Sequence, residues 1–270
     1  MNSFDDRPIG VFDSGIGGIT VLRELVKNFP KESFLYLGDT ARLPYGSKSP
    51  ETVRQYSIQN MQYLVSRNVK AIIVACNTAS TQIFETHYKD IPIYNVIDPG
   101  SLLAAKTTKN NKIAVLATRA TIRAGTYPEK IKKHNPEAQV LSQACPLFVP
   151  LAEEAWYEDP VTNIIAFRYL QKLKAADVDT VVLGCTHYPL LKTAIRKVFG
   201  NDVTLIDSGE AISHELAADF AKEHVLPNSL EINKLTIALT DASEQFENLS
   251  NELLCTVTSR FIEFETVSVI

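Results

Sequence analysis

The sequence predicts an α/β protein of two pseudo-symmetric lobes, each a mainly parallel sheet flanked by helices, with the functional site in the cleft between them. Three observations favour this fold. Apolar strand-like runs alternate with helical patterns, one strand–helix–strand unit occurs twice, and each copy ends its first strand at a cysteine. Residues 69–100 align without a gap with residues 178–209, at a constant offset of 109 that pairs Cys76 with Cys185.

The first part of the chain alternates strand and helix patterns, as parallel sheets with helical crossovers require. The strand-like apolar runs lie at 9–12, 33–37, 71–75 and 93–97. The helical patterns follow at 19–29, at 50–68 and from about 78. Ser49-Pro50 supplies an N-cap followed by proline at the first helical position. The run at 71–75 lacks polar alternation, which indicates a strand buried on both faces.

Two loops in this part carry polar residues. The turn at 13–18 has the strand–turn–helix layout of a phosphate cradle, but it matches neither GxGxxG nor the P-loop pattern, so we do not predict nucleotide binding. The polar loop at 38–48 has the length of a functional loop or of an ordinary Ω-loop, and the sequence leaves both interpretations open.

Two matching corners predict how the chain passes between the lobes. Asp98-Pro99-Gly100 and Asp207-Ser208-Gly209 occupy equivalent positions in the two copies of the unit. We therefore expect a first lobe of residues 1–97 plus 208–270 and a second lobe of residues 98–207. The other predicted elements are strands at 112–117, 180–183, 203–206 and 234–239, helices at 160–176, 189–199, 210–224 and 243–254, and a strand-like end from 256.

The composition is that of an ordinary globular chain. Its 270 residues are 45% hydrophobic and 21% charged, enough for one large or two modest domains. The net charge of −4 and the absence of a Lys/Arg-rich stretch argue against nucleic acid and anionic membrane as partners. No apolar run approaches the roughly 18 residues of a membrane span, and the N-terminus lacks signal-peptide features. We expect a cytoplasmic protein with reduced thiols.

The four cysteines do not form a metal or redox motif. They show neither CxxC nor zinc-ligand spacing, so we expect no metal, although His187 lies two residues after Cys185. A lone cysteine in an apolar neighbourhood is most often inert packing. We assign that structural role to Cys145 and Cys255, which lack an equivalent in the other copy.

Cys76 and Cys185 are different because a twofold axis between the lobes would bring them face to face. Each stands where a buried strand stops and a helical pattern begins, so we expect the helix N-terminus to lower the thiol pKa from about 8.5 toward neutrality. Opposed thiols of this kind suit the transfer of a proton from one face of a carbon to the other. This pattern is typical of a two-base racemase or epimerase.

The other polar residues near the strand ends suit a small zwitterion. Carboxylates can be held by helix-start N–H groups and by neutral side chains, here Ser14, Asn77, Thr78, Thr118, Thr121 and Thr186. Asp13 is placed to bind a substrate ammonium or to orient a thiol. His187 is placed to polarise the carboxylate or to assist Cys185, and an ordinary turn histidine is the alternative.

Four long motifs, in order and over nearly the whole chain, resemble the glutamate racemases of the cofactor-independent aspartate/glutamate racemase superfamily. They lie at 13–18, 38–46, 75–80 and 183–191. A fifth stretch, 145–155, is also similar, but it has Ala152 where valine is common and Ala155 where glycine is common. We therefore assign no role to Glu153.

The resemblance implies two α/β lobes with the active site between them, and interconversion of L- and D-glutamate, without a cofactor, for bacterial peptidoglycan synthesis. It makes Cys76 the base toward D-glutamate and Cys185 the base toward L-glutamate. It adds Pro44, Tyr45 and Gly46 to the substrate contacts and implies a homodimer. The short N-terminus lacks the extension that carries regulation by a nucleotide precursor in some relatives, so we do not expect that regulation.

Three alternatives remain. Within the same class, an aspartate or other acidic amino-acid racemase differs only in pocket size, which the sequence does not give. A bilobal binding protein would also clamp a ligand between lobes, but it needs no matched thiols. A pyridoxal enzyme would reveal itself by the visible absorbance of its cofactor.

Overall fold

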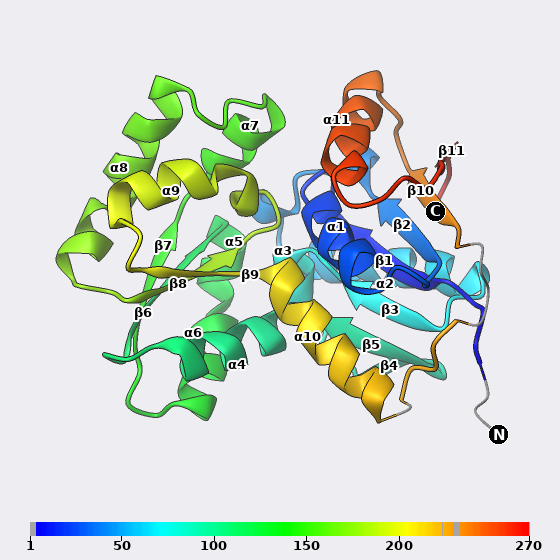
Figure 1. Cartoon of the computed structure of the whole chain (residues 1–270), viewed down its shortest axis with the longest axis horizontal. Coiled ribbons are helices and arrows are strands. Elements are labelled where there is room, and N and C mark those ends of the chain that lie inside the picture. The colour runs from blue at the N-terminus through cyan, green and yellow to red at the C-terminus, as the bar shows by residue number, and fades with distance from the viewer. Residues whose placement is uncertain (1–3, 223, 229–232, 270) are drawn as a thin grey trace.

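The computed structural model describes residues 4–222, 224–228 and 233–269, arranged as two lobes side by side (Figure 1). A seven-stranded sheet has the order β11-β10-β2-β1-β3-β5-β4, and a four-stranded sheet has the order β7-β6-β8-β9. Every pairing in both sheets is parallel except β4 with β5. The predicted α/β fold with mainly parallel sheets is therefore confirmed.

The first lobe is built from both ends of the chain. Its strands are β1 (Ile9–Asp13), β2 (Phe34–Gly38), β3 (Ala71–Val74), β4 (His87–Tyr88), β5 (Ile91–Asn95), β10 (Leu235–Leu239) and β11 (Ile262–Thr266). Its helices are α1 (Gly18–Asn28), α2 (Pro50–Ser66), α3 (Asn77–Ser80), α10 (Ser208–Ala221) and α11 (Glu244–Cys255). Strands β1, β2 and β3 are buried along their whole length, as expected for strands covered on both faces.

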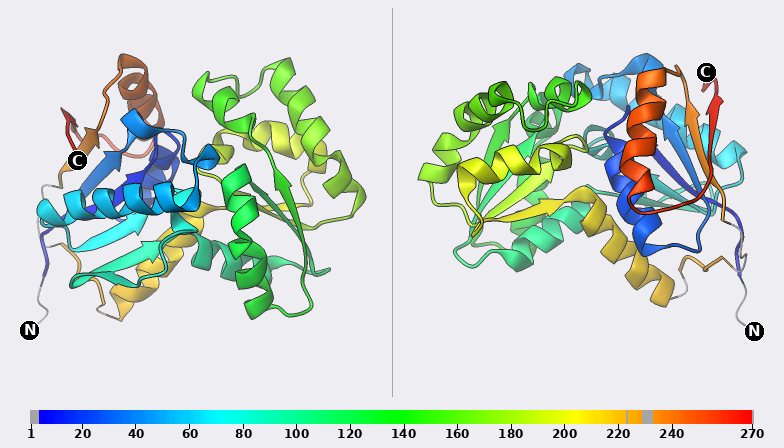
Figure 2. Two further views of the ribbon diagram at one scale, coloured as in Figure 1. Left: turned by 180° about the vertical axis from the view of Figure 1, so that it is seen from behind. Right: turned by 45° about the horizontal axis from the view of Figure 1, so that its top comes forward.

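Alternate residues of each central strand feed two separate hydrophobic layers. Val11 packs in the layer that also holds side chains of α1, α10 and α11, whereas Phe12 packs in the layer shared with α2. Figure 2 shows this division: α2 crosses one face of the sheet, and α1 and α11 cover the other. Burial on both faces is what makes the carboxyl ends of these strands rigid supports for polar residues.

The second lobe repeats this plan with the middle of the chain. Its strands are β6 (Lys112–Ala117), β7 (Gln139–Ala144), β8 (Thr180–Gly184) and β9 (Thr204–Asp207). Its helices are α4 (Ile97–Thr107), α5 (Arg119–Ala124), α6 (Thr126–His134), α7 (Phe148–Glu153), α8 (Pro160–Ala175) and α9 (Lys192–Phe199). The order β7-β6-β8-β9 is equivalent to β2-β1-β3-β5 in the first lobe, so the central parts of the two lobes share one topology.

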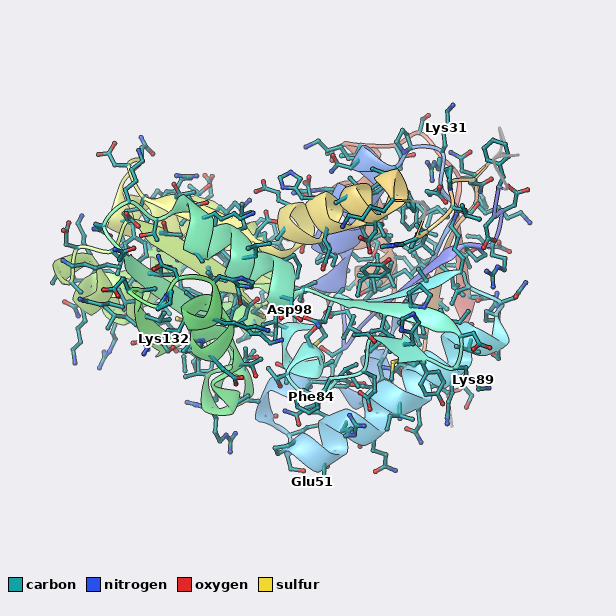
Figure 3. All side chains as sticks on the ribbon, turned by 90° about the horizontal axis from the view of Figure 1, so that it is seen from below. Lys31, Glu51, Phe84, Lys89, Asp98 and Lys132 are labelled. Carbon is teal, nitrogen blue, oxygen red and sulfur yellow. The ribbon has the colours of Figure 1, made fainter. Side chains whose placement is uncertain are left out.

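The repeat holds at the cysteines but shifts afterwards. Strands β3 and β8 keep the offset of 109, whereas β5 ends at Asn95 and its counterpart β9 ends at Asp207. Asp98 therefore falls inside the first turn of α4, at the junction of the lobes (Figure 3), while Asp207 caps α10 by accepting from Glu210 N at 2.8 Å. Asn95 does the capping of α4 instead, because its Oδ1 accepts from the backbone N–H groups of Ile97 and Asp98.

Several elements differ from the sequence expectation. The helix expected from residue 78 is the single turn α3, and the helix expected at 189–199 begins as a 3-10 turn, Tyr188–Leu191, before α9. The strand expected at 93–97 lies at Ile91–Asn95. Residue 223 of the predicted helix 210–224 lies outside the described residues, and α10 ends at Ala221. The division into 1–97 plus 208–270 and 98–207 stays a prediction.

No helix in the described ranges combines the length and the hydropathy that a membrane span needs. Within those same ranges, no three His, Cys, Asp or Glu side chains gather as metal ligands would.

Candidate active site

A cavity of about 480 Å³ lies between the lobes, within the usual range for small-molecule sites. The carboxyl ends of β1 and β3 reach it from the first lobe, and those of β6 and β8 reach it from the second. Most of the predicted site residues line it: Ser14, Pro44, Tyr45, Gly46, Cys76, Asn77, Thr78, Thr118, Cys185, Thr186 and His187. Asp13 and Thr121 do not line it but are buried directly behind lining residues.

Cys76 follows β3 and presents its sulfur in an apolar and anionic setting. Its Sγ lies 3.8 Å from Ser14 Oγ, and the residue is only 5% exposed. Burial raises the pKa of the Cys76 thiol well above its ordinary value, and the carboxylate of Asp13 raises it further. The prediction of a lowered pKa is therefore wrong for this cysteine, because α3 is a four-residue turn whose N–H groups do not offset burial.

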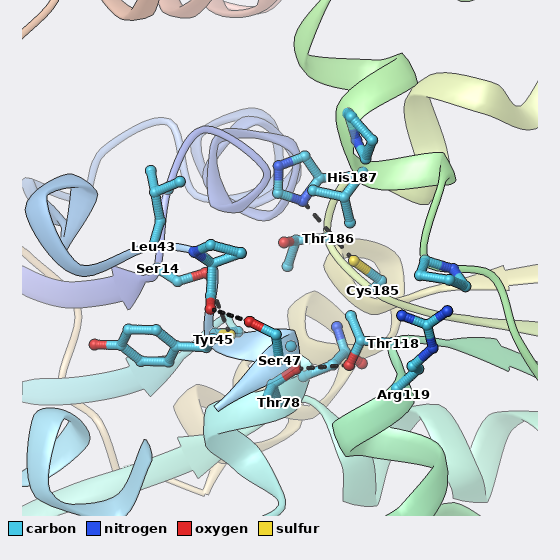
Figure 4. Close-up of a pocket in the computed structure, with 18 of the residues that line it drawn as sticks. Ser14, Leu43, Tyr45, Ser47, Thr78, Thr118, Arg119, Cys185, Thr186 and His187 are labelled. Carbon is cyan, nitrogen blue, oxygen red and sulfur yellow. Dashed lines mark hydrogen bonds between the residues drawn. The ribbon is translucent and has the colours of Figure 1, made fainter. Parts of the chain in front are cut away.

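Cys185 follows β8 and has a cationic neighbour instead. Its Sγ lies 3.8 Å from His187 Nδ1 (Figure 4), and His187 Nε2 lies 3.1 Å from Glu153 Oε1. Burial disfavours the charged ring, but the hydrogen bonds to Cys185 and Glu153 outweigh burial and raise the pKa of His187 to about 10. At neutral pH the ring is an imidazolium, which is a charge partner for a thiolate. Glu153, to which we assign no role from the sequence alone, holds the His187 ring in this arrangement.

Asp13 connects the lobes behind the cavity wall. Its Oδ1 accepts from Gly15 N at 2.9 Å, and its Oδ2 accepts from Thr186 Oγ1 of the opposite lobe at 3.1 Å. Burial raises the pKa of Asp13, although the charge of His187 and these hydrogen bonds lower it in part. A second bond crosses at the same place, because Thr20 Oγ1 donates to the carbonyl of Thr186 at 2.8 Å. These contacts fix the residue that follows Cys185.

Three threonines form a compact hydroxyl cluster on the other side of the cavity. Thr78 Oγ1 of the first lobe lies 3.0 Å from Thr118 Oγ1 of the second lobe (Figure 4) and 3.1 Å from Thr121 Oγ1 of the same lobe as Thr118. Thr118 also caps α5 by accepting from Thr121 N. Gly46 packs against this cluster so closely that an added Cβ would lie 2.8 Å from Thr118 Cβ. Hydroxyls and helix-start N–H groups of this kind bind carboxylates without a formal charge.

The loop at 38–48 forms the first-lobe rim of the cavity. Tyr45 turns its ring away from the cavity, where its hydroxyl donates to Asp39 and accepts from Asn60 Nδ2 at 3.1 Å. Arg42 also binds the Asp39 carboxylate, with Nε at 2.8 Å. The side chain of Tyr45 thus anchors the loop, which leaves the backbone of Pro44, Tyr45 and Gly46 to face the cavity.

Besides Glu153 and Ser47, sequence reasoning missed four further polar residues around the cavity. Arg119 and Arg123 line it from the second lobe, one helical turn apart on the exposed face of α5. Their spacing directly after Thr118 was a usable signal. Tyr127 and Ser208 lie behind the wall and contact Asn77. Nothing in the sequence near residue 77 points to these two, since only the fold brings them together.

The chain matches the Asp/Glu/hydantoin racemase family over residues 9–216. The glutamate racemase of Geobacter metallireducens is 44% identical over 92% of this chain and 93% of its own. The glutamate racemase of Sulfurihydrogenibium sp. is 42% identical over 95% and 97%.

Solved structures agree. A glutamate racemase from Bacillus anthracis superimposes with a TM-score of 0.90 and 34% identity, covering 97% of each chain. The Francisella tularensis glutamate racemase in complex with D-glutamate gives a TM-score of 0.86 and 36% identity over 98% of each chain.

Proposed function

The chain belongs to the Asp/Glu/hydantoin racemase family, and we propose that it interconverts L- and D-glutamate with two cysteines as acid and base. Relatives at 40–44% identity over at least nine-tenths of this chain are glutamate racemases, and one similar structure holds D-glutamate. The observation that carries the proposal is the cavity itself, in which Cys76 of one lobe and Cys185 of the other line a single space. A proton can leave one face of a bound α-carbon while another arrives at the opposite face.

The neighbours of the two sulfurs favour a different role, base or acid, for each cysteine at the start of the reaction. The His187 ring, whose pKa is raised, lies 3.8 Å from Cys185 Sγ and favours Cys185 as the base, whereas the raised pKa of Cys76 favours that thiol as the acid. By family resemblance Cys185 acts on L-glutamate and Cys76 on D-glutamate. The free enzyme is then ready for the L-isomer, and after each turnover in that direction solvent must return a proton to Cys76 and remove one from Cys185.

We assign recognition of the substrate to the polar walls of the cavity. The hydroxyl cluster of Thr78, Thr118 and Thr121, with the backbone of the Pro44–Gly46 segment, suits one carboxylate. Asn77, Thr186 and the helix-start N–H groups suit the carboxylate next to the reacting carbon, because negative charge grows there as the proton leaves. Ser14, backed by Asp13, suits the ammonium group. No step requires a cofactor, since the protein supplies both the acid and the base.

The wider setting is also proposed from the family. The chain would act as a homodimer in the cytoplasm and supply D-glutamate for peptidoglycan synthesis. The lobes 1–97 plus 208–270 and 98–207 would close on the substrate.

Circular dichroism of L-glutamate incubated with the purified protein tests this function. The signal of L-glutamate should decay to zero in buffer with EDTA and no added cofactor. The signal of D-glutamate, which has the opposite sign, should decay to the same final value of zero. L-Aspartate in the same assay is the specificity control and should keep its signal. A stable glutamate signal with a decaying aspartate signal would move the chain to the aspartate branch. Stable signals for both would refute racemisation of acidic amino acids.

A further inference from the structure

Tyr127 is a buried residue of α6 that reaches across the lobes to the residue beside Cys76. Its hydroxyl donates to Asn77 Oδ1 at 2.6 Å, and its side chain is 2% exposed. Asn77 also contacts Ser208 at the start of α10, with Ser208 Oγ 3.2 Å from Nδ2 and 3.3 Å from Oδ1. Asn77 itself lines the cavity.

These contacts determine which end of the Asn77 amide is available to a ligand. A primary amide offers an oxygen that accepts and a nitrogen with two N–H donors. The phenol hydroxyl, a good donor, occupies the oxygen, and Ser208 takes at most one of the two N–H groups. At least one N–H therefore remains for the cavity. If the amide were flipped, its oxygen would be the free end and would repel a carboxylate.

The same tyrosine also contacts the other cysteine motif. A Cβ added to Gly184 would lie 3.1 Å from Tyr127 Cε2 and 3.0 Å from the Leu116 carbonyl, so the ring occupies space that only glycine leaves open. Gly184 immediately precedes Cys185. Tyr127 thus packs behind Cys185 with its ring and holds the neighbour of Cys76 with its hydroxyl.

We propose that Tyr127 is a positioning residue, which fixes the Asn77 amide with an N–H directed at the substrate carboxylate next to the reacting carbon. This inference rests on the proposed racemisation. Charge develops on that carboxylate whichever cysteine takes the proton, so the orientation of Asn77 serves both directions equally. Ser208 contributes less to the same positioning, through its contacts with the Asn77 amide.

Tyr127→Phe is the direct test, because it removes the hydroxyl and keeps the ring that fills the space at Gly184. We expect kcat/KM for glutamate to fall about tenfold, as for loss of one buried hydrogen bond. Tyr94→Phe is the matched control: it removes the hydroxyl of another buried tyrosine, which donates to Asp219 at 2.9 Å, and Asp219, unlike Asn77, does not line the cavity. The control should keep wild-type kinetics.

A double-mutant cycle separates positioning from a general loss of stability. If Tyr127 acts through Asn77, then Tyr127→Phe should cost little in an Asn77→Ala background, so the two effects are not additive. Additive effects, or wild-type kinetics in Tyr127→Phe, would overturn the inference. An inactive wild-type protein would instead refute the proposed function.

Asn77→Asp provides a second variant that does not depend on the folding of Tyr127→Phe. It keeps an oxygen for the Tyr127 hydroxyl but replaces the amide N–H with a second, negatively charged oxygen. We expect at least a hundredfold loss of kcat/KM with little change in the thermal transition, roughly the cost of setting a like charge against the substrate. Near-normal kinetics in this variant would show that the N–H end of Asn77 does not face the carboxylate.

Discussion

The two cysteines occupy equivalent positions in two lobes of one topology, yet their polar neighbours are not equivalent. Cys76 has the Ser14 hydroxyl at 3.8 Å and the anionic Asp13 behind it, and its pKa is raised. Cys185 has the His187 ring at 3.8 Å, held in turn by Glu153. The shared fold places the sulfurs, whereas unrelated neighbours surround each of them. A duplicated scaffold can therefore hold two equivalent thiols in different electrostatic settings.

Thermodynamics restricts how this asymmetry can appear. The two enantiomers have equal free energy in water, so kcat/KM must be the same in both directions for the wild type and for every variant. Differences between the two sides must appear in isotope effects, in pH dependence and in the separate values of kcat and KM.

Replacing either cysteine should give the largest loss. Cys76→Ser and Cys185→Ser should each lower kcat/KM by roughly 10³-fold, because a serine hydroxyl is a much poorer acid and base. With Cys76→Ser, α-deuterated D-glutamate should show a large primary isotope effect and α-deuterated L-glutamate a small one, and Cys185→Ser should reverse this order. The double variant should be little worse than either single variant.

The control for this comparison is Cys145→Ser, since Cys145 is buried outside the cavity and should have no part in the reaction. Near-normal turnover in either of the first two variants would end the two-thiol interpretation. If the same enantiomer shows the larger isotope effect in both Cys76→Ser and Cys185→Ser, the two cysteines do not act on separate enantiomers.

Much of this arrangement was predictable from local sequence. The repeat led to Cys76 and Cys185, and the polar residues beside each strand end followed from the geometry of parallel sheets. The residue at which α4 begins was not predictable. Strand β5 ends three residues earlier in the repeat than β9, and Asn95 rather than Asp98 caps the helix. The reversed pKa shift of Cys76 depends on burial, which is a property of the whole fold.

The residues that sequence reasoning missed share one physical feature. Glu153 and Tyr127 lie 34 and 50 residues from their partners His187 and Asn77, and neither belongs to a motif around those partners. A strand end or a helix start has a local pattern, but a hydrogen bond between residues far apart in the chain does not. Such contacts become visible only when the chain is folded.

Changing the partner of His187 should shift a pH profile on the Cys185 side. His187 has a pKa raised to about 10, so the imidazolium and the activity that depends on it should be lost as pH rises through that value. Glu153→Gln removes a negative charge that favours the imidazolium, so the fall in kcat should move to lower pH. Ser14→Ala changes a neighbour of Cys76 instead, so it should leave the pH of this alkaline fall in kcat unchanged. Identical alkaline limbs in wild type and Glu153→Gln would show that Glu153 does not control His187.

Thr186→Ala tests the contact that crosses from the Cys185 side to Asp13. The variant removes the single Thr186 O–H, which Asp13 Oδ2 accepts in this structure and which would have to turn to reach the substrate carboxylate. We expect a loss of transition-state stabilisation of about 1–3 kcal/mol, measured from kcat/KM. Thr20→Val removes the contacts of Thr20 Oγ1 with the Thr186 and Gly17 carbonyls but keeps the Thr186 hydroxyl, and it should cost less. If Thr20→Val instead lowers kcat/KM more than Thr186→Ala, the backbone position of Thr186 contributes more to the reaction than its hydroxyl does.

The smallest effect concerns the mouth of the cavity, where the lobes also differ. Arg119 and Arg123 supply positive charge from the second lobe only, while the first-lobe rim at 44–47 is uncharged. Glutamate carries a net negative charge, so these exposed guanidinium groups should attract it without touching the reacting carbon. Arg119→Gln and Arg123→Gln should each raise KM about two- to fivefold at low ionic strength and leave kcat unchanged, with the difference vanishing at high salt.

Arg168→Gln is the matched control, because Arg168 is an exposed arginine of α8 in the same lobe that does not line the cavity. It changes the net charge by the same amount, so an equal effect on KM would mean that overall charge, not the asymmetric mouth, guides the substrate. A fall in kcat that persists at high salt would instead place the arginines in contact with the bound substrate.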